Sequence, residues 1–109
     1  MKISSNSIIQ KLLPEFIESG INDFAIIVPD LIIKKDKSEL YRYAHSWKGA
    51  AAQYEFPELS DKCKALLSAA TSEDWSKADT LTTSILTDIL EIQSVFTQKK
   101  KLTKDFYFN

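Results

Sequence analysis

The chain contains a single histidine, His45, in the stretch AHSWKGAAAQYEF near its middle. An exposed imidazole is largely neutral at pH 7, so one of its ring nitrogens is free to act as a nucleophile. On a helix, Lys48 would lie close enough to reach the ring, and Gly49 would lie one turn beyond it. A nucleophilic nitrogen beside a cation and a residue without a side chain suits the transfer of a phosphoryl group from a docked partner.

The helical period predicts which way His45 faces. On a helix over residues 40–55, one stripe is apolar and must face the core: Leu40, Tyr43, Ala44, Trp47, Ala51 and Tyr54. A second group gathers on another face, about 145° away: Tyr41, His45, Lys48, Gly49 and Ala52. Gly49 costs a helix interior about 1 kcal/mol relative to alanine, which indicates that something must approach closely there. We therefore expect an exposed imidazole above a strip of small residues.

Length and charge limit the possible functions. The chain has 109 residues, which predicts one domain over residues 1–109. Its 14 basic and 15 acidic residues leave a net charge of −1, so nothing favours general binding of nucleic acid. The one cysteine, Cys63, cannot form an internal disulfide, and with one histidine it makes a zinc site improbable. Since Cys63 shares a helical stripe with Leu59 and Leu66, we expect it to pack in the core.

The amino-terminal stretch lacks the apolar core and small-residue cleavage site of a signal peptide. The longest apolar run, AIIVPDLII, contains Pro29 and Asp30 and is too short to cross a bilayer. A single cysteine fits a reducing compartment. These features predict a soluble, cytoplasmic protein with no membrane partner.

Two glycines and strong helical periodicity predict an all-helical chain. The pattern favours a helix over residues 6–18 that ends at Gly20, and a second over residues 22–34 that Pro29 kinks or splits. A third helix, capped by Asp36 or Ser38, is expected to run to about Tyr54.

The rest of the chain predicts two more helices. One begins at Pro57, which suits a first helical position. The last follows TSED, in which Thr71 and Asp74 resemble a capping box, and it carries a regular apolar stripe to Phe96. Residues 102–109 are expected to form a loose or back-folded tail. Short connections imply an antiparallel up-down four-helix bundle, with a further short helix at the amino end.

The stretch AHSWKGAAAQYEFPELSDKCKALL resembles the motif of histidine-containing phosphotransfer (HPt) domains, which covers about a quarter of the chain. That motif reads A-H-x-L-K-G, then small residues, then two leucines seven residues apart. The matching positions are Ala44, His45, Lys48, Gly49, Leu59 and Leu66. The chain departs from the pattern at Trp47, where the family often has leucine, at Glu55, where it often has glycine, and at Pro29, in a helix that usually runs unbroken.

The resemblance implies a four-helix bundle that relays phosphoryl groups without being an independent enzyme. His45 would be phosphorylated, Lys48 would help to hold the phosphoryl group, and Gly49 would give the partner room. We assign Tyr41 and Ala52 to the partner-binding surface. The implied partners are a response-regulator receiver domain, a hybrid sensor histidine kinase or both. Magnesium would belong to the receiver, so no metal or cofactor is expected here, and we expect a monomer.

Two other functions fit the same residues. The chain could be a binding module of the same shape that docks and sequesters a receiver without carrying phosphate. It could also be a helical adaptor in which His45 has no chemical role and Tyr41 is an ordinary surface residue.

Overall fold

The computed structural model describes residues 2–108, with side chains described for residues 2–99. Its helices are α1 (Ser7–Asn22), α2 (Val28–Ile33), α3 (Lys37–Gln53), α4 (Pro57–Thr71) and α5 (Trp75–Phe108), with a π-helical turn, η1 (Asp23–Ile27), between α1 and α2. No strand occurs within residues 2–108. The prediction of an all-helical chain is confirmed.

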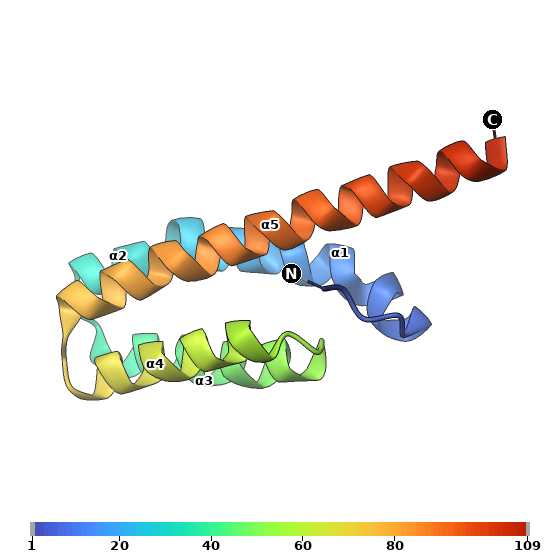
Figure 1. The fold of residues 1–109 in the computed structure, drawn as a ribbon. Helices are drawn as coiled ribbons and strands as arrows, with labels where there is room; N and C mark the ends of the chain where they lie inside the picture. The colour runs from blue at the N-terminus through green and yellow to red at the C-terminus, as the bar shows by residue number, and fades with distance from the viewer. Residues whose placement is uncertain (1, 109) are drawn as a thin grey trace.

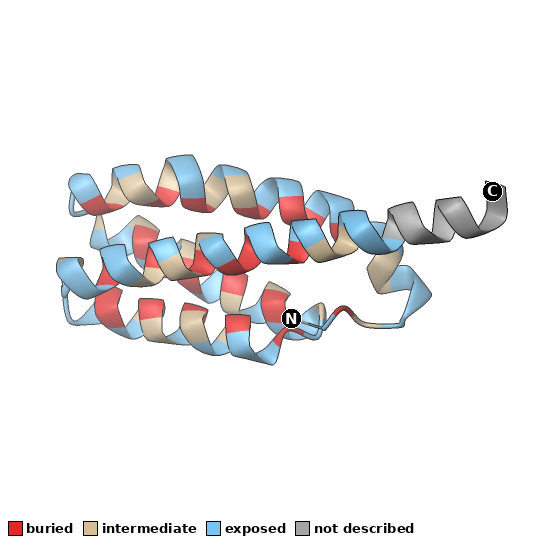
Figure 2. Ribbon diagram, turned by 45° about the horizontal axis from the view of Figure 1, so that its top comes forward, coloured by how far each residue is buried: buried red, intermediate tan, exposed pale blue. Residues whose placement is uncertain are grey.

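The helices form a bundle around one core. Figure 1 shows α1, η1 and α2 following one another beside α5, with α3 and α4 side by side below them. Helix α5 contacts α1, α2 and α4, while α3 contacts α2 and α4. Buried residues line the sides of the helices that face one another, and exposed residues cover the outside (Figure 2).

The amino-terminal helix does not end at Gly20, as the sequence pattern predicts. Helix α1 continues through Gly20 to Asn22, and Gly20 is buried. A Cβ atom at this position would lie 2.8 Å from Ile89 Cδ1 and 3.1 Å from Trp47 Cη2. Gly20 therefore serves close packing among α1, α3 and α5 rather than helix termination.

Pro29 changes the form of the helix without breaking the chain into separate helices. Proline lacks an N–H group, and its ring crowds the carbonyl group four residues earlier, which here belongs to Ala25. The turn Asp23–Ile27 is π-helical, and the Val28 N–H group donates to the Asp23 carbonyl oxygen, five residues back. The wider turn accommodates Pro29, and residues 7–33 form one helical segment.

Short turns with the same hydrogen bonds join the later helices. Lys35, Glu55 and Glu73 each have positive φ, and the following N–H group donates to a carbonyl oxygen five residues back. Glu55 thus adopts, at a φ of 65°, the left-handed conformation that glycine adopts most readily. The glycine often found at this position of HPt motifs is therefore not needed for the turn to form here.

Side chains fix where these helices begin. Of the two caps expected for α3, Asp36 is used, because its carboxylate accepts from the Glu39 N–H group at 3.2 Å. Helix α4 begins at Pro57, as predicted. The expected capping box at the start of α5 is wrong: Thr71 ends α4, and Asp74 caps α5 by accepting from the Lys77 N–H group.

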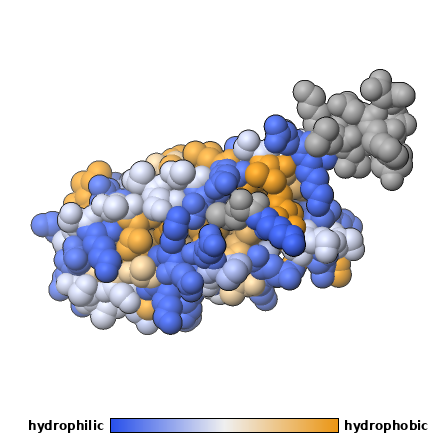
Figure 3. Space-filling view, in the orientation of Figure 1, coloured by the Kyte–Doolittle hydropathy of each residue, from blue (hydrophilic) through white to orange (hydrophobic). Residues whose placement is uncertain are grey.

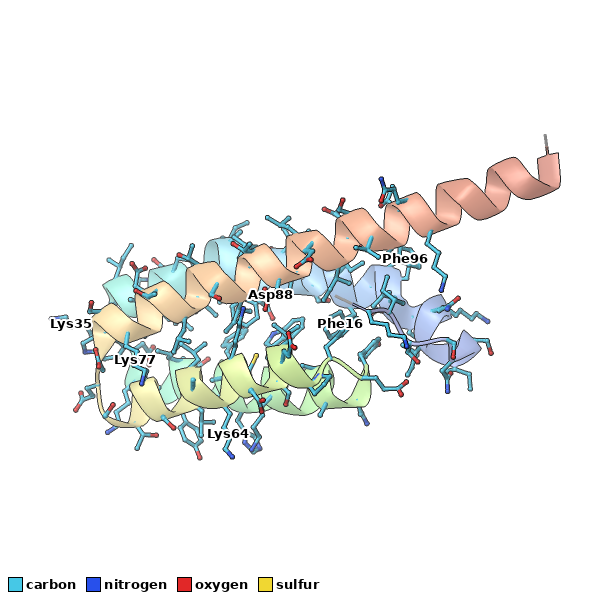
Figure 4. The ribbon with its side chains drawn as sticks, viewed as in Figure 1. Phe16, Lys35, Lys64, Lys77, Asp88 and Phe96 are labelled. Atoms are coloured by element: carbon cyan, nitrogen blue, oxygen red, sulfur yellow. The ribbon has the colours of Figure 1, made fainter. Side chains whose placement is uncertain are left out.

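An aromatic cluster holds α1 against α3. The Phe16 ring lies 5.2 Å from Trp47 and 4.4 Å from Tyr54, measured between ring centroids. Phe24 contacts the other side of Trp47 at 5.3 Å. Figure 4 shows Phe16 directed from α1 into the interior. These contacts fix the rotation of α3, which carries the histidine.

Helix α5 extends past the other helices (Figure 1), and its backbone stays helical through Phe108. Residues 102–108 therefore continue α5 rather than form the separate tail expected from the sequence, while their side chains lie outside the described part. Figure 3 shows hydrophilic and hydrophobic side chains interspersed on one face of the bundle. Among the described residues, no helix combines the length and apolar character needed to span a bilayer.

Candidate functional site

The predicted inward stripe of α3 is confirmed. Leu40, Ala44, Trp47 and Ala51 are buried, and Tyr43 and Tyr54 are half-buried. Since these residues hold one face of α3 against the core, the opposite face must be directed to solvent. The orientation of the histidine-bearing face therefore follows from the core contacts of its own helix.

The outward face of α3 carries all five residues assigned from the sequence to phosphoryl transfer or partner binding. His45, Gly49, Ala52 and Tyr41 are exposed, and Lys48 is half-buried. They lie on one continuous helix, so their relative positions depend on α3 alone. The prediction that His45 faces solvent is confirmed.

Gly49 leaves the space beside His45 empty. Apart from its chain neighbours and the backbone of its own helix, a Cβ atom built at Gly49 would meet no atom within 4 Å. Side chains in a helix lean toward its amino end and cover the turn before their own Cα atom. A large side chain at position 49 would thus lean over His45, whereas glycine leaves the imidazole uncovered on that side.

Tyr41 lies on the other side of His45, one turn toward the amino end. The two rings are 6.3 Å apart between centroids and only 3° from parallel. Within residues 2–99, no hydrogen bond or ion pair engages the His45 side chain. The ring nitrogens are therefore not occupied by a neighbouring side chain of that part of the molecule.

Lys48 brings a positive charge to the same face. It follows His45 by three residues, and its side chain leans back toward the imidazole by the same helical rule. The Ser60 hydroxyl donates to the Lys48 carbonyl oxygen at 2.9 Å, which ties α4 to this turn of α3. An anionic group attached to His45 would thus lie within reach of a cation on a backbone braced by α4.

Trp47 anchors this helix from inside. Its indole N–H group donates to the Asp23 carboxylate at 2.7 Å, so the polar atom of the large ring is satisfied. Gly20 provides the room that the indole needs. Tryptophan at a position where HPt motifs often have leucine is therefore accommodated by two compensating residues, Gly20 and Asp23.

Sequence reasoning missed three residues that support the site: Gly20, Asp23 and Ser60. The contacts of Gly20 and Asp23 join positions far apart in the chain, which helical periodicity cannot pair. Ser60 could have been found from the sequence, because a polar residue on the side of α4 next to α3 needs a hydrogen-bond partner.

Cys63 is confirmed as a buried core residue on α4. Burial, together with the negative charge of Asp88, raises the pKa of its thiol to about 12. Asp88 on α5 is buried and lies 2.7 Å from Lys62 Nζ (Figure 4 labels Asp88 between α5 and α4). In the described part of the chain, no three His, Cys, Asp or Glu side chains are grouped to hold a metal ion.

Comparison with protein-family models, with curated proteins and with solved structures found no match to this chain. The residues of α3, through their exposure and their chemistry, are therefore what indicates a function for this chain.

Proposed function

We propose that the chain is an HPt domain that carries a phosphoryl group on His45 between two-component signalling proteins. The observation that carries the proposal is the exposed imidazole of His45, with open space at Gly49 and a cation at Lys48. A surface histidine without a function needs none of this arrangement. A helix that is not approached by a partner would also be more stable with alanine than with glycine at position 49.

The proposed fold is an antiparallel up-down four-helix bundle. Residues 7–33 would count together as the first helix, with the expected amino-terminal helix as its first part, followed by α3, α4 and α5. In this arrangement the middle of α3 lies away from the bundle's ends and presents exposed residues to solvent. A compact receiver domain could dock there without opening the core.

The proposed transfer needs only groups supplied by the two proteins. A neutral ring nitrogen of His45 attacks the phosphorus of an aspartyl phosphate, and the P–O bond breaks with its electron pair going to the aspartate. In the second half-reaction, the aspartate of another receiver attacks that phosphorus, and the electrons of the P–N bond return to the imidazole. Lys48 stabilises the negative phosphoryl oxygens in both directions.

The proposed partners are receiver domains, a hybrid sensor kinase or both, and the chain acts as a monomeric carrier rather than an independent enzyme. Magnesium would be supplied by the receiver. The lone buried cysteine fits a reducing compartment, and we place the relay in the cytoplasm.

The test is phosphotransfer from receiver domains that have been labelled with radioactive acetyl phosphate. We expect the chain to gain label that is lost in acid and retained in alkali, and the His45→Gln variant to gain none. Stable binding without label would instead indicate a module that sequesters receivers. Neither label nor binding across a panel of receivers would contradict the proposal and favour an adaptor.

A further inference from the structure

The ring contact between Tyr41 and His45 differs from the other aromatic pairs of the described residues. Each of the other pairs includes Phe16 or Phe24, which are buried in the core. Tyr41 and His45 are both exposed, yet their rings are parallel to within 3°. Their centroid separation of 6.3 Å lies in the range of offset-stacked aromatic rings.

The helix itself brings these rings together. A side chain in a helix leans toward the amino end, so the His45 ring is directed over position 41, one turn earlier. An exposed imidazole without a neighbour would rotate among several conformations. Tyr41 provides an aromatic surface that favours the conformation in which the two rings are parallel.

Stacking suits a nucleophilic imidazole better than a hydrogen bond does. The lone pair of the reactive nitrogen lies in the plane of the ring, whereas Tyr41 contacts a face of the ring. The stack therefore orients the imidazole without occupying either nitrogen. Gly49, on the opposite side of His45, leaves the approach to the ring open.

We propose that Tyr41 is a positioning residue that stacks on His45 and holds the imidazole in the orientation from which it takes a phosphoryl group. This inference rests on the proposed function above. It differs from a role in partner binding because it acts through the His45 ring and needs no partner. The aromatic face is the required feature, and the phenolic hydroxyl is not.

The test compares Tyr41→Ala with Tyr41→Phe, Tyr41→Leu and a control on the same helix, Ser46→Ala. Tyr41 and Ser46 are exposed, so these variants should fold, and circular dichroism checks that they do. Phosphoramidate, a small phosphoryl donor, probes the reactivity of His45 without any protein partner. Nuclear magnetic resonance (NMR) spectra of the His45 ring protons report the ring current of Tyr41.

We expect Tyr41→Ala and Tyr41→Leu to shift the His45 ring protons and to slow phosphoramidate labelling about three- to tenfold. Tyr41→Phe should keep both properties, and Ser46→Ala should change neither. Wild-type labelling rates in Tyr41→Ala, or ring-proton shifts that do not change, would overturn the positioning role.

The two proposals can fail separately. If phosphoramidate labels His45 in a Tyr41-dependent way but no phosphorylated receiver transfers to the chain, the proposed function is wrong and the ring orientation by Tyr41 stands. If receivers transfer normally to Tyr41→Ala at the same maximal rate, the relay function stands and the positioning role is overturned. A rise in the half-saturating receiver concentration at an unchanged maximal rate would also overturn it, because that is the effect of a partner contact.

Discussion

At the scale of single residues, His45 and Gly49 illustrate a conflict between stability and access. Glycine weakens the middle of α3, and no other part of the described fold requires it there, because a Cβ atom at this position would meet nothing within 4 Å beyond its own helix backbone and chain neighbours. On the proposed function, a docking partner that must reach His45 would account for a glycine that the fold itself does not require.

Gly49→Ala is expected to stabilise the protein by up to about 1 kcal/mol, because alanine favours the helix and clashes with nothing. Gly49→Leu is expected to slow transfer from a phosphorylated receiver by about tenfold or more, equivalent to ~1.4 kcal/mol, because its side chain leans over His45. Chemical denaturation measures the first effect, and transfer kinetics measure the second. Ser46→Leu is the control. An unchanged rate of transfer to Gly49→Leu would refute the role of Gly49 in leaving room for the partner.

Lys48→Ala is expected to slow transfer about 10- to 100-fold while changing receiver affinity less, since on the proposed function the ammonium group would act on the phosphoryl oxygens. Lys48→Arg keeps the charge and should restore part of the rate. Stopped-flow transfer and equilibrium titration separate the two quantities. An equal loss of rate and affinity would make Lys48 a docking residue instead.

At the scale of helices, the packing of α1, α3 and α5 depends on Gly20. Gly20→Ala is expected to destabilise the fold by about 1–3 kcal/mol, because its Cβ atom would lie 2.8 Å from Ile89 Cδ1. Ile89→Val removes that methyl group, so the cost of Gly20→Ala should be smaller in the Ile89→Val background. A double-mutant cycle in urea tests this coupling.

The same substitution, glycine to alanine, can be compared at Gly20 and at Gly49. Gly49→Ala should stabilise an open helix surface, while Gly20→Ala should destabilise a crowded helix crossing. If both substitutions stabilised the protein, the close approach at Gly20 would not limit the packing of these helices.

Periodicity is sufficient to predict the outward direction of His45, because burial along one helix depends on the angular positions of its own residues. It is insufficient at Gly20, because a glycine that ends a helix and a glycine at a helix crossing look alike in sequence. It is also insufficient for Asp23 and Trp47, whose hydrogen bond joins residues 24 positions apart. Periodicity also cannot predict the π-helical turn before Pro29, because that turn depends on support from the neighbouring helices.

At the scale of the whole molecule, Cys63 links stability to pH. Its folded pKa of about 12 lies above the ordinary value of 9.0, so the unfolded chain loses this proton first as pH rises. Folding stability should therefore fall between about pH 9 and pH 12, by at most about 1.4 kcal/mol per pH unit from this group. Well below pH 9 the thiol is protonated in both states and contributes no slope.

Urea unfolding at a series of pH values measures this decline, and Cys63→Ala should make it shallower, although the smaller side chain lowers stability overall. The thiol should also resist alkylation in the folded protein at pH 8 and react once the protein is unfolded. Rapid alkylation of the native protein, or the same alkaline slope in Cys63→Ala, would contradict the burial argument.

The helical class could be predicted from apolar spacing and the scarcity of glycine, and the starts of α3 and α4 from Asp36 and Pro57. The sequence pattern predicts the start of α5 too early, because Asp74 and not Thr71 caps it. The number of separate amino-terminal helices could not be predicted from the sequence, since it depends on whether neighbouring helices stabilise a π-helical turn. The exposed face of α3 is predictable from sequence, whereas the stacking of Tyr41 on His45 requires side-chain conformations.

The central claim is that His45 itself carries a phosphoryl group received from a receiver aspartate. Its most direct test is mass spectrometry, under alkaline conditions that preserve phosphohistidine, of the chain after incubation with phosphorylated receivers. We predict one added phosphoryl group, localised by fragmentation to His45 and missing in His45→Gln. Phosphoryl addition at another residue, or none while receivers remain phosphorylated, would contradict it.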